Sequence, residues 1–329
     1  MDLYPVQKPY FSRDPKQESS WVMFLLSVAF VSAFILVFAW PQTRSVTFIL
    51  ALQQWRSAPL ELLFRALTFL GDDQFFMIFF SVLIWCVSKT LGFWGAFMLL
   101  ASGTYGNLIK DITLLERPPL EGVIHPAGSY AFPSGHTLTA VTVWGYLAVR
   151  LQKKALWVWT FLAVVMIGFS RLVLGYHFLG DVLGGLSFGI LFLLFFLWVS
   201  ANIYEKGWSD KLSTPLLLII SIALPVMLTV VLPGADPPKL MGFLAGASFG
   251  YLLEKEKVRS LVEAKFTLQV IKVVLGAVVL FGIIFGLGGI LPSSVVWLGF
   301  IRYALGGIWV TLFAPLLFVS IKLARRAES

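Results

Sequence analysis

Charge and cysteine are both scarce in this chain of 329 residues. Only 13% of its residues are charged, whereas about 25% is usual for a soluble globular protein. Cys86 is the single cysteine, which excludes a disulfide within the chain. The two asparagines, Asn107 and Asn202, begin no N-x-[ST] sequon, so glycosylation gives no information about the compartment.

Hydrophobic residues, by contrast, make up 58% of the chain, which is about 190 residues. A membrane-spanning helix needs about 20 apolar residues, so this number suffices for roughly nine or ten spans. Long runs of Leu, Phe and Val favour helices over the alternating pattern of an outer-membrane barrel. The sequence therefore predicts an all-α, polytopic integral membrane protein with about ten transmembrane helices, and it excludes a soluble enzyme or a disordered chain.

Uncharged apolar runs give the expected positions of these helices. They fall at about 21–40, 74–88, 91–109, 135–149, 155–170, 182–201, 216–232, 240–253, 267–290 and 303–321. The first run is longer than a signal-peptide core and has tryptophan at both ends, so we interpret it as a retained span. In the run at 240–253, Gly242, Gly246 and Gly250 predict close packing against another helix.

Between the first two runs, segment 45–70 has apolar residues at helical spacing, interrupted by Arg56 and Arg65. This pattern predicts two short amphipathic helices at the membrane interface. We interpret Arg44, Arg56, Arg65 and Arg302 as headgroup contacts or local anchors. The Asp72–Asp73 pair is interpreted as a cap at the positively poled start of the second span, with a role as a second acid pair as the alternative.

Charge placement predicts the orientation of the chain. The net charge is +8. If the N-terminus and C-terminus are cytoplasmic, most basic residues fall in cytoplasmic segments, as the positive-inside rule requires. Orientation then accounts for the basic excess, and no nucleic acid partner is expected.

The basic residues that remain on the outer side include three that accompany histidines. Lys110 ends the third run, Arg171 ends the fifth, and Ser134, Gly135 and His136 open the fourth. Because successive helices cross the membrane and return, we expect these residues to converge at one outer face, together with Arg117, His177 and Asp181.

These residue types suit a phosphate ester. Lys110, Arg117 and Arg171 concentrate positive charge, and Ser134–Gly135 at a helix start presents free backbone N–H groups to an anion. The two histidines supply a nucleophile and a proton donor near neutral pH. Asp181 lies four residues after His177, so its carboxylate can hold Nδ1–H and leave Nε2 free to attack phosphorus. We interpret His125 as an ordinary polar residue of the interface.

Three motifs carry a resemblance to a known family. The patterns K-x6-RP (110–118), PSGH (133–136) and SR-x5-H-x3-D (170–181) resemble the type 2 phosphatidic acid phosphatase (PAP2) superfamily. That superfamily includes lipid phosphatases, glucose-6-phosphatase and vanadium haloperoxidases. The resemblance covers roughly 45–205 and implies a six-helix catalytic bundle.

The resemblance also implies roles for the matched residues. His177 would form a phosphohistidine, Asp181 would orient it, and His136 would protonate the leaving oxygen and later activate water. The phosphoryl oxygens would be held by Lys110, Arg117, Ser134, Gly135 and Arg171. No cofactor is implied and the reaction would be metal-independent; the sequence likewise has no acidic cluster of metal-ligand type.

We therefore expect a membrane lipid phosphate phosphatase with a catalytic domain at 1–205. The alternatives are a phosphatase for a soluble ester, as glucose-6-phosphatase is, and a lipid transporter or flippase with a phosphatase-like core. Residues 206–329 form an additional four-helix module, as in sphingosine-1-phosphate phosphatases, and are a scaffold, a homodimer surface or a lipid guide. The short loops favour a bacterial inner membrane, with the site facing the periplasm or the exterior and membrane lipids around it.

Overall fold

A computed structural model describes residues 41–327, apart from residues 56, 121–122, 124–129, 206–211, 233 and 235. The predicted first span at 21–40 and the interpretation of His125 lie outside the described residues. Within those residues the regular elements are helices, and the one bridge of β type joins Ser260 to Arg326. The predicted all-α class is confirmed for this part of the chain.

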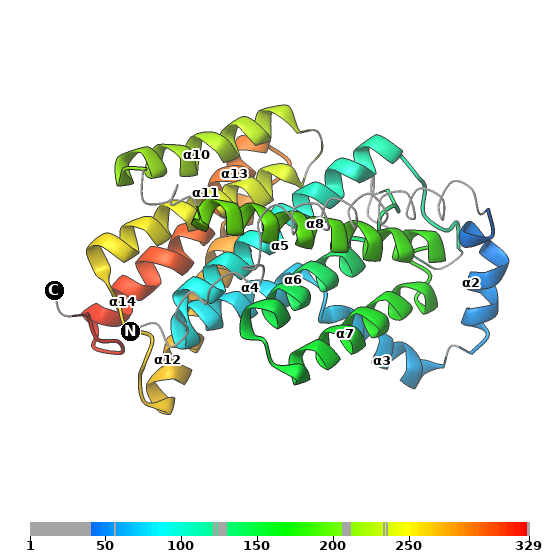
Figure 1. Cartoon of the computed structure of the whole chain (residues 1–329), viewed down its shortest axis with the longest axis horizontal. Helices are drawn as coiled ribbons and strands as arrows, with labels where there is room; N and C mark the ends of the chain where they lie inside the picture. The colour runs from blue at the N-terminus through cyan, green and yellow to red at the C-terminus, as the bar shows by residue number, and fades with distance from the viewer. Residues whose placement is uncertain are drawn as a thin grey trace. The chain divides into compact units, whose positions relative to one another are not determined.

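Two compact units make up the structure (Figure 1). Among the described residues, unit 1 contains those of 77–104 and 212–327, and unit 2 contains those of 41–76 and 105–205. Helices α4 (Asp73–Val82) and α5 (Lys89–Thr113) each contribute residues to both units. The units are therefore interleaved along the sequence.

Unit 2 begins with short helices. These are η2 (Pro41–Arg44), α2 (Val46–Gln53) and α3 (Ala58–Phe69). The Ser45 side chain caps α2 by accepting a hydrogen bond from the Phe48 N–H at 3.3 Å. The two short helices predicted within 45–70 are therefore confirmed.

Three long helices complete unit 2: α6 (Gly135–Leu151), α7 (Lys154–Val173) and α8 (Leu179–Glu205). Helix α6 is buried throughout 137–148 and packs against both of the others. Helix α8 approaches the start of α6 so closely that a Cβ at Gly185 would lie 2.6 Å from the Ser134 carbonyl oxygen. Glycine at this position fixes the start of α6 beside the start of α8.

Unit 1 holds the remaining helices. They are η3 (Leu83–Val87), α10 (Thr214–Val231), α11 (Pro237–Leu253), η4 (Glu254–Val258), α12 (Phe266–Ile284), η5 (Gly286–Gly289), α13 (Val296–Ile308), η6 (Trp309–Phe313) and α14 (Ala314–Ser320). Helices α11 and α13 are in close backbone contact. A Cβ atom at Gly242 would lie 2.2 Å from the Phe300 carbonyl oxygen, and a Cβ atom at Gly246 would lie 2.0 Å from the Ala304 carbonyl oxygen. The close packing predicted from the glycine spacing is confirmed.

A buried ion pair lies in unit 1. Lys89 Nζ donates to both carboxylate oxygens of Glu254, at 3.0 and 2.9 Å, and to the Ser260 carbonyl at 2.6 Å. The same carboxylate accepts the Ser260 N–H at 2.8 Å and its hydroxyl at 2.7 Å. These contacts join the first turn of α5 to the segment that follows α11.

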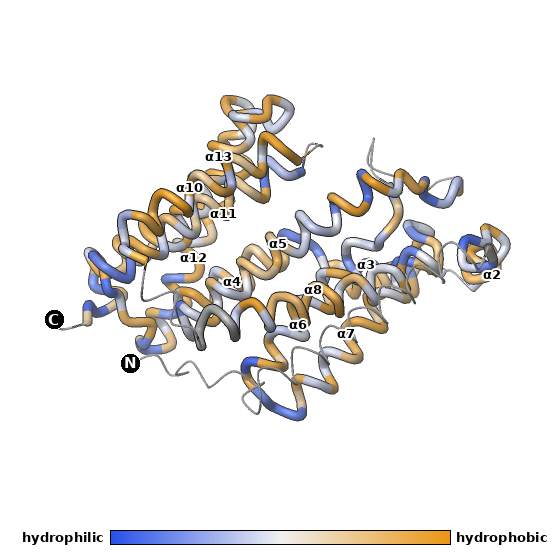
Figure 2. Tube along the Cα trace, turned by 45° about the horizontal axis from the view of Figure 1, so that its top comes forward, coloured by the Kyte–Doolittle hydropathy of each residue, from blue (hydrophilic) through white to orange (hydrophobic). Residues whose placement is uncertain are grey.

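Five helical segments of the described chain are long and apolar enough to cross a membrane. They are Lys154–Val173, Leu179–Ser200, Thr214–Val231, Phe266–Gly289 and Val296–Ser320. The pair Ala58–Phe69 and Asp73–Val87, bent by 50°, would make a sixth. Hydrophobic colour dominates α10 in Figure 2, and its Val230 is 69% exposed. Such surfaces suit lipid, and the molecule is an integral membrane protein.

Candidate active site

The eight residues predicted to form the site all belong to unit 2. Helix α5 ends just after Lys110, α6 begins at Gly135, and α7 ends just after Arg171. After α7 the chain turns at Gly175, whose φ of 75° is in the left-handed region that glycine adopts without strain. The turn is closed by hydrogen bonds from the Tyr176 and His177 N–H groups to the Arg171 carbonyl, at 3.0 and 3.4 Å.

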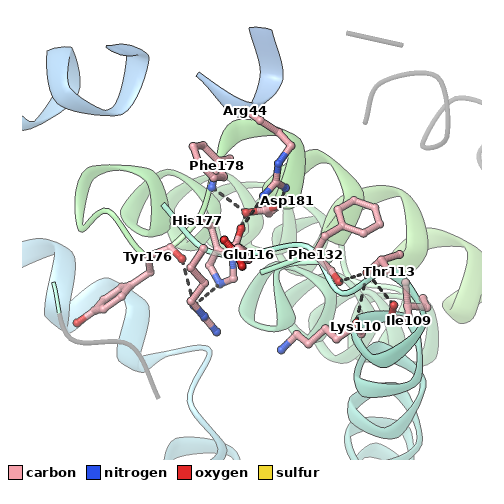
Figure 3. A network of polar contacts seen from close by, with 11 residues as sticks. Arg44, Ile109, Lys110, Thr113, Glu116, Phe132, Tyr176, His177, Phe178 and Asp181 are labelled. Atoms are coloured by element: carbon pink, nitrogen blue, oxygen red, sulfur yellow. Dashed lines mark hydrogen bonds and ion pairs between the residues drawn. The ribbon is translucent and has the colours of Figure 1, made fainter. Parts of the chain in front are cut away.

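The start of α6 is held by its neighbours. Ser134 is completely buried, and its N–H donates to the Asp181 carbonyl at 2.9 Å. A Cβ at Gly135 would lie 3.6 Å from Lys110 Nζ, so this ammonium group is adjacent to the first turn of α6. The Thr113 hydroxyl contacts the Phe132 carbonyl at 3.2 Å and so joins the end of α5 to the same segment (Figure 3).

His177 lies at the centre of the polar network in Figure 3 and is only 1% exposed. Its Nε2 lies 3.4 Å from Arg117 Nη1, and Arg117 also donates to the Tyr176 carbonyl at 3.1 Å. A guanidinium group only donates, so Nε2 accepts and the proton of a neutral ring is on Nδ1. Nδ1 faces Asp181 Oδ2 at 3.6 Å, which is an ionic contact longer than a hydrogen bond.

Asp181 is completely buried and is held from two sides. Oδ1 accepts from Arg44 Nη1 at 2.6 Å, and Oδ2 accepts from the Phe178 N–H at 2.8 Å. Arg44 also donates to the Glu116 carbonyl at 2.6 Å and stacks over the Phe178 ring at 4.6 Å. The interpretation of Arg44 as a headgroup contact or anchor is therefore wrong, because its guanidinium positions Asp181 within the site.

His136 also has a carboxylate partner. Its Nε2 lies 2.6 Å from Asp72 Oδ1, and Asp72 belongs to the turn between α3 and α4. A Cβ at Gly71 in the same turn would lie 3.3 Å from His136 Cδ2. The Asp72 carbonyl accepts the Phe76 N–H at 3.2 Å, as expected at a helix start. The interpretation of the Asp72–Asp73 pair as charges at a helix start agrees with α4, which begins at Asp73, and the Asp72 side chain in addition contacts His136.

The same turn reaches a second site residue. Arg171 Nη1 donates to the Thr68 hydroxyl at 2.8 Å, and the guanidinium lies 4.4 Å from the centre of the Tyr176 ring. The segment 68–72, which comprises the end of α3 and the turn that follows it and is here called the α3–α4 turn, therefore contacts both His136 and Arg171. The sequence predicts Asp72 at a helix start, with an acid pair as the alternative, but it does not predict the contacts of this segment with His136 and Arg171.

Electrostatics keep His177 neutral. Burial is the main cause that lowers its pKa well below the ordinary value of 6.5, and the nearby charges of Arg171, Arg117 and Lys110 lower it further. A neutral imidazole retains the lone pair that a nucleophile needs. Burial also lowers the pKa of Arg117, which remains a cation at neutral pH.

The arrangement combines a neutral nucleophile with several cations. Arg117 Nη1 lies 3.4 Å from the His177 ring, and Lys110 Nζ is adjacent to the first turn of α6. The charges of Arg171, Arg117 and Lys110 oppose a proton on His177 and favour an anion beside its ring. A phosphoryl group is an anion of suitable charge and geometry for such a set. The site is therefore chemically suited to phosphoryl transfer.

Comparison with known protein families finds a match for each of two segments of the chain. Residues 91–205 match the PAP2 superfamily, and residues 238–326 match the transmembrane extension of PAP2 superfamily phosphatases. Phosphatidylglycerophosphatase B of Bacillus subtilis (strain 168) is 35% identical over 130 residues, 36% of this chain and 59% of the relative. Lipid phosphate phosphatase delta of Arabidopsis thaliana is 28% identical over 176 residues, 48% of this chain and 42% of the relative.

The chain thus spans roughly two to three fifths of the length of these curated relatives. Among solved structures, the crystal structure of a transmembrane PAP2 type phosphatidylglycerolphosphate phosphatase from Bacillus subtilis matches 60% of this chain and 97% of its own. That match has 22% sequence identity and a TM-score of 0.43. With the site motifs within the first matched region and the extension in the second, the chain belongs to the PAP2 superfamily.

Proposed function

We propose that this protein is an integral-membrane phosphatase that removes phosphate from a lipid phosphate monoester or diphosphate. The observation that carries the proposal is the buried His177, held between a guanidinium at Nε2 and a carboxylate facing Nδ1. This is the geometry of an oriented nucleophile beside an anion-binding group. The names of the relatives support a lipid phosphate as the substrate.

In the first half-reaction, Lys110, Arg117 and Arg171 bind the phosphoryl oxygens together with the N–H groups of Ser134 and Gly135. The entering phosphate replaces His177 Nε2 as the acceptor of the Arg117 donor. Nε2 attacks phosphorus, the bond from phosphorus to the lipid oxygen breaks, and protonated His136 transfers its proton to that oxygen.

The phosphohistidine then has a positive ring whose Nδ1–H faces Asp181, which stabilises the charge. In the second half-reaction, neutral His136 accepts a proton from water while the water oxygen attacks phosphorus. The bond between phosphorus and Nε2 breaks, inorganic phosphate leaves, and His136 is again protonated. We propose no cofactor and no metal ion, because three side-chain cations supply the charge neutralisation that metal ions supply in other phosphoryl-transfer enzymes.

The proposed membrane arrangement has ten spans, with both termini in the cytoplasm. The site then opens at the outer face of a bacterial inner membrane, toward the periplasm or the exterior. A substrate held there keeps its phosphate in water and its tail in lipid. Residues 1–205 are the proposed catalytic domain, and residues 206–329 serve as a scaffold, a homodimer surface or a lipid guide.

Phosphate release in detergent tests the proposal. We expect purified protein in EDTA to release phosphate from at least one of phosphatidate, phosphatidylglycerophosphate, polyprenyl phosphate or diphosphate, and sphingoid phosphate. Glucose 6-phosphate is the comparison for a soluble substrate. A His177→Ala variant should be inactive, and acid-labile phosphate should form on the parent protein alone.

Three results would contradict the proposal. They are a folded protein that releases no phosphate, a His177→Ala variant as active as the parent, and turnover that requires a divalent metal. Faster hydrolysis of glucose 6-phosphate than of every lipid would assign the protein to soluble esters instead.

A further inference from the structure

We propose that Asp72 is a positioning residue for the proton transfers of His136, so that each histidine of the site works with its own carboxylate. The inference rests on the proposed function, because it assigns a partner to the acid–base group of that reaction. Asp72 lies outside the three sequence motifs and comes from the α3–α4 turn. The distance of 2.6 Å between His136 Nε2 and Asp72 Oδ1 is that of a short, charge-assisted hydrogen bond.

The charges around His136 explain why it needs this partner. Burial opposes a positive charge on the His136 ring most strongly, and the charges of Arg171 and Lys110 oppose it further. Asp72 is the negative group among these neighbours. An acid catalyst must carry its proton when substrate arrives, and a carboxylate at hydrogen-bond distance stabilises the protonated ring against the surrounding cations.

The hydrogen bond also decides which nitrogen exchanges protons. An ionised carboxylate only accepts, so Asp72 keeps a proton on Nε2 and leaves Nδ1 for the reaction. In the first half-reaction the Nδ1–H bond breaks as the lipid oxygen leaves phosphorus and gains the proton. In the second, Nδ1 takes a proton from the attacking water. Asp72 itself neither gains nor loses a proton in either step.

The α3–α4 turn is built to hold this contact. Gly71 brings the backbone close to the edge of the His136 ring, where a Cβ would lie 3.3 Å from Cδ2. Four residues before Asp72, Thr68 receives the hydrogen bond of Arg171 at 2.8 Å. One turn therefore orients the acid–base histidine and a phosphate-binding arginine together.

Asp72 differs from Asp181 in its exposure. The Asp181 side chain is completely buried, whereas those of Asp72 and His136 are 38% and 25% exposed. A partly exposed pair can exchange protons with water between turnovers, which a general acid and base requires and an orienting carboxylate does not. The rival explanation is that Asp72 occupies the place of the leaving oxygen and must move away when substrate binds.

Leaving-group dependence separates these explanations. Two substrates are compared, an alkyl phosphate and a nitrophenyl phosphate that carries the same alkyl chain. The alkoxide needs a proton to leave, whereas nitrophenolate leaves without one. Because kcat/KM covers only the steps through loss of the leaving group, it isolates the first proton transfer.

We expect Asp72→Asn to lower kcat/KM about 100-fold for the alkyl phosphate and less than about tenfold for the nitrophenyl phosphate. A His136→Gln variant should show the same pattern. Asp72→Glu should recover part of the loss, and the neighbouring Asp73→Asn is the matched control, with kcat/KM near that of the parent. Thermal unfolding in detergent checks that each variant is folded.

Equal losses for the two substrates would overturn the proposal, because a purely structural role lowers both alike. An Asp72→Asn variant as active as the parent, or more active, would favour the rival explanation. Failure of the proposed function gives a different result, in which the parent hydrolyses neither substrate or His177→Ala retains activity.

Discussion

The acid limb of the pH profile of kcat/KM depends on His177. Replacing Arg117 with glutamine should move this limb to higher pH. In the parent, burial and the charges of Arg171, Arg117 and Lys110 hold the pKa of His177 well below 6.5. The nucleophile is therefore neutral at pH 6.5 and stays neutral as the pH falls further. We therefore expect protonation of His177 to lower kcat/KM only well below pH 6.5.

The size of the change follows from one distance. Arg117 Nη1 lies 3.4 Å from His177 Nε2. At a similar separation of about 4 Å, two unit charges repel by about 4 kcal/mol at an effective dielectric constant of 20. Water that enters in place of the guanidinium will offset part of this, so we expect the acid limb of Arg117→Gln to rise by about 1 pH unit or more. Weaker phosphate binding will lower the plateau of kcat/KM without moving the limb.

The assay measures kcat/KM for one lipid phosphate from pH 4 to 8 in parent and variant. The substrate phosphate also titrates near pH 6, but its ionisation is the same for both proteins, so only the difference between the profiles reports on His177. An acid limb at the same pH in parent and Arg117→Gln would refute the reasoning.

Protonation of His177 should also lower the stability of the folded protein as the pH falls. Because the folded state holds His177 neutral while the unfolded chain binds a proton below its ordinary pKa of 6.5, the unfolded state is favoured as the pH falls below 6.5. The free energy of unfolding should decrease by at most about 1.4 kcal/mol per pH unit from this group. Thermal unfolding in detergent between pH 7 and pH 5 measures the trend.

Three further changes test other contacts. Arg44→Ala should lower kcat about tenfold at nearly constant KM, because Asp181 loses a charged hydrogen bond; a change in KM alone would contradict this. Gly246→Ala should destabilise unit 1 by about 3 kcal/mol or more in thermal unfolding, since its Cβ would meet the α13 backbone, whereas Gly282→Ala, with open space around it, should not. Glu254→Gln should lower the free energy of unfolding by about 2 kcal/mol, because Lys89 loses its charged partner. An unfolding midpoint equal to that of the parent would contradict this.

The helices were predictable because their signal is local. Apolar runs of spanning length and glycines at four-residue spacing report directly on lipid and on neighbouring helices, and each predicted run within the described residues is largely helical. The motif residues were predictable for a related reason. Their spacing places them at helix ends, and Lys110, Gly135 and His177 lie where those ends come together.

The partners of the motif residues were not predictable in this way. Arg44 and Asp181 are 137 positions apart, and Asp72 and His136 are 64 apart. No periodicity relates such pairs, because each depends on how a short helix packs beside a long one. An arginine near the start of a helix is most often an anchor, so composition favoured the wrong interpretation for Arg44. For Asp72 it indicated the helix start but not the contact with His136. The one indication in the sequence was the number of charged residues expected on the outer side, which exceeds the number in the three motifs.

The ion pair between Lys89 and Glu254 has a consequence for biosynthesis. Its partners are 165 positions apart, and the eight motif residues of the proposed site are synthesised between them. At 5–20 residues per second, roughly 8–33 s pass between translation of the lysine and of its carboxylate. The first half of α5 is therefore synthesised before the residues that complete its packing exist. A chain that ends near residue 205 would contain every motif residue and still leave α5 without the partners that hold its first turn.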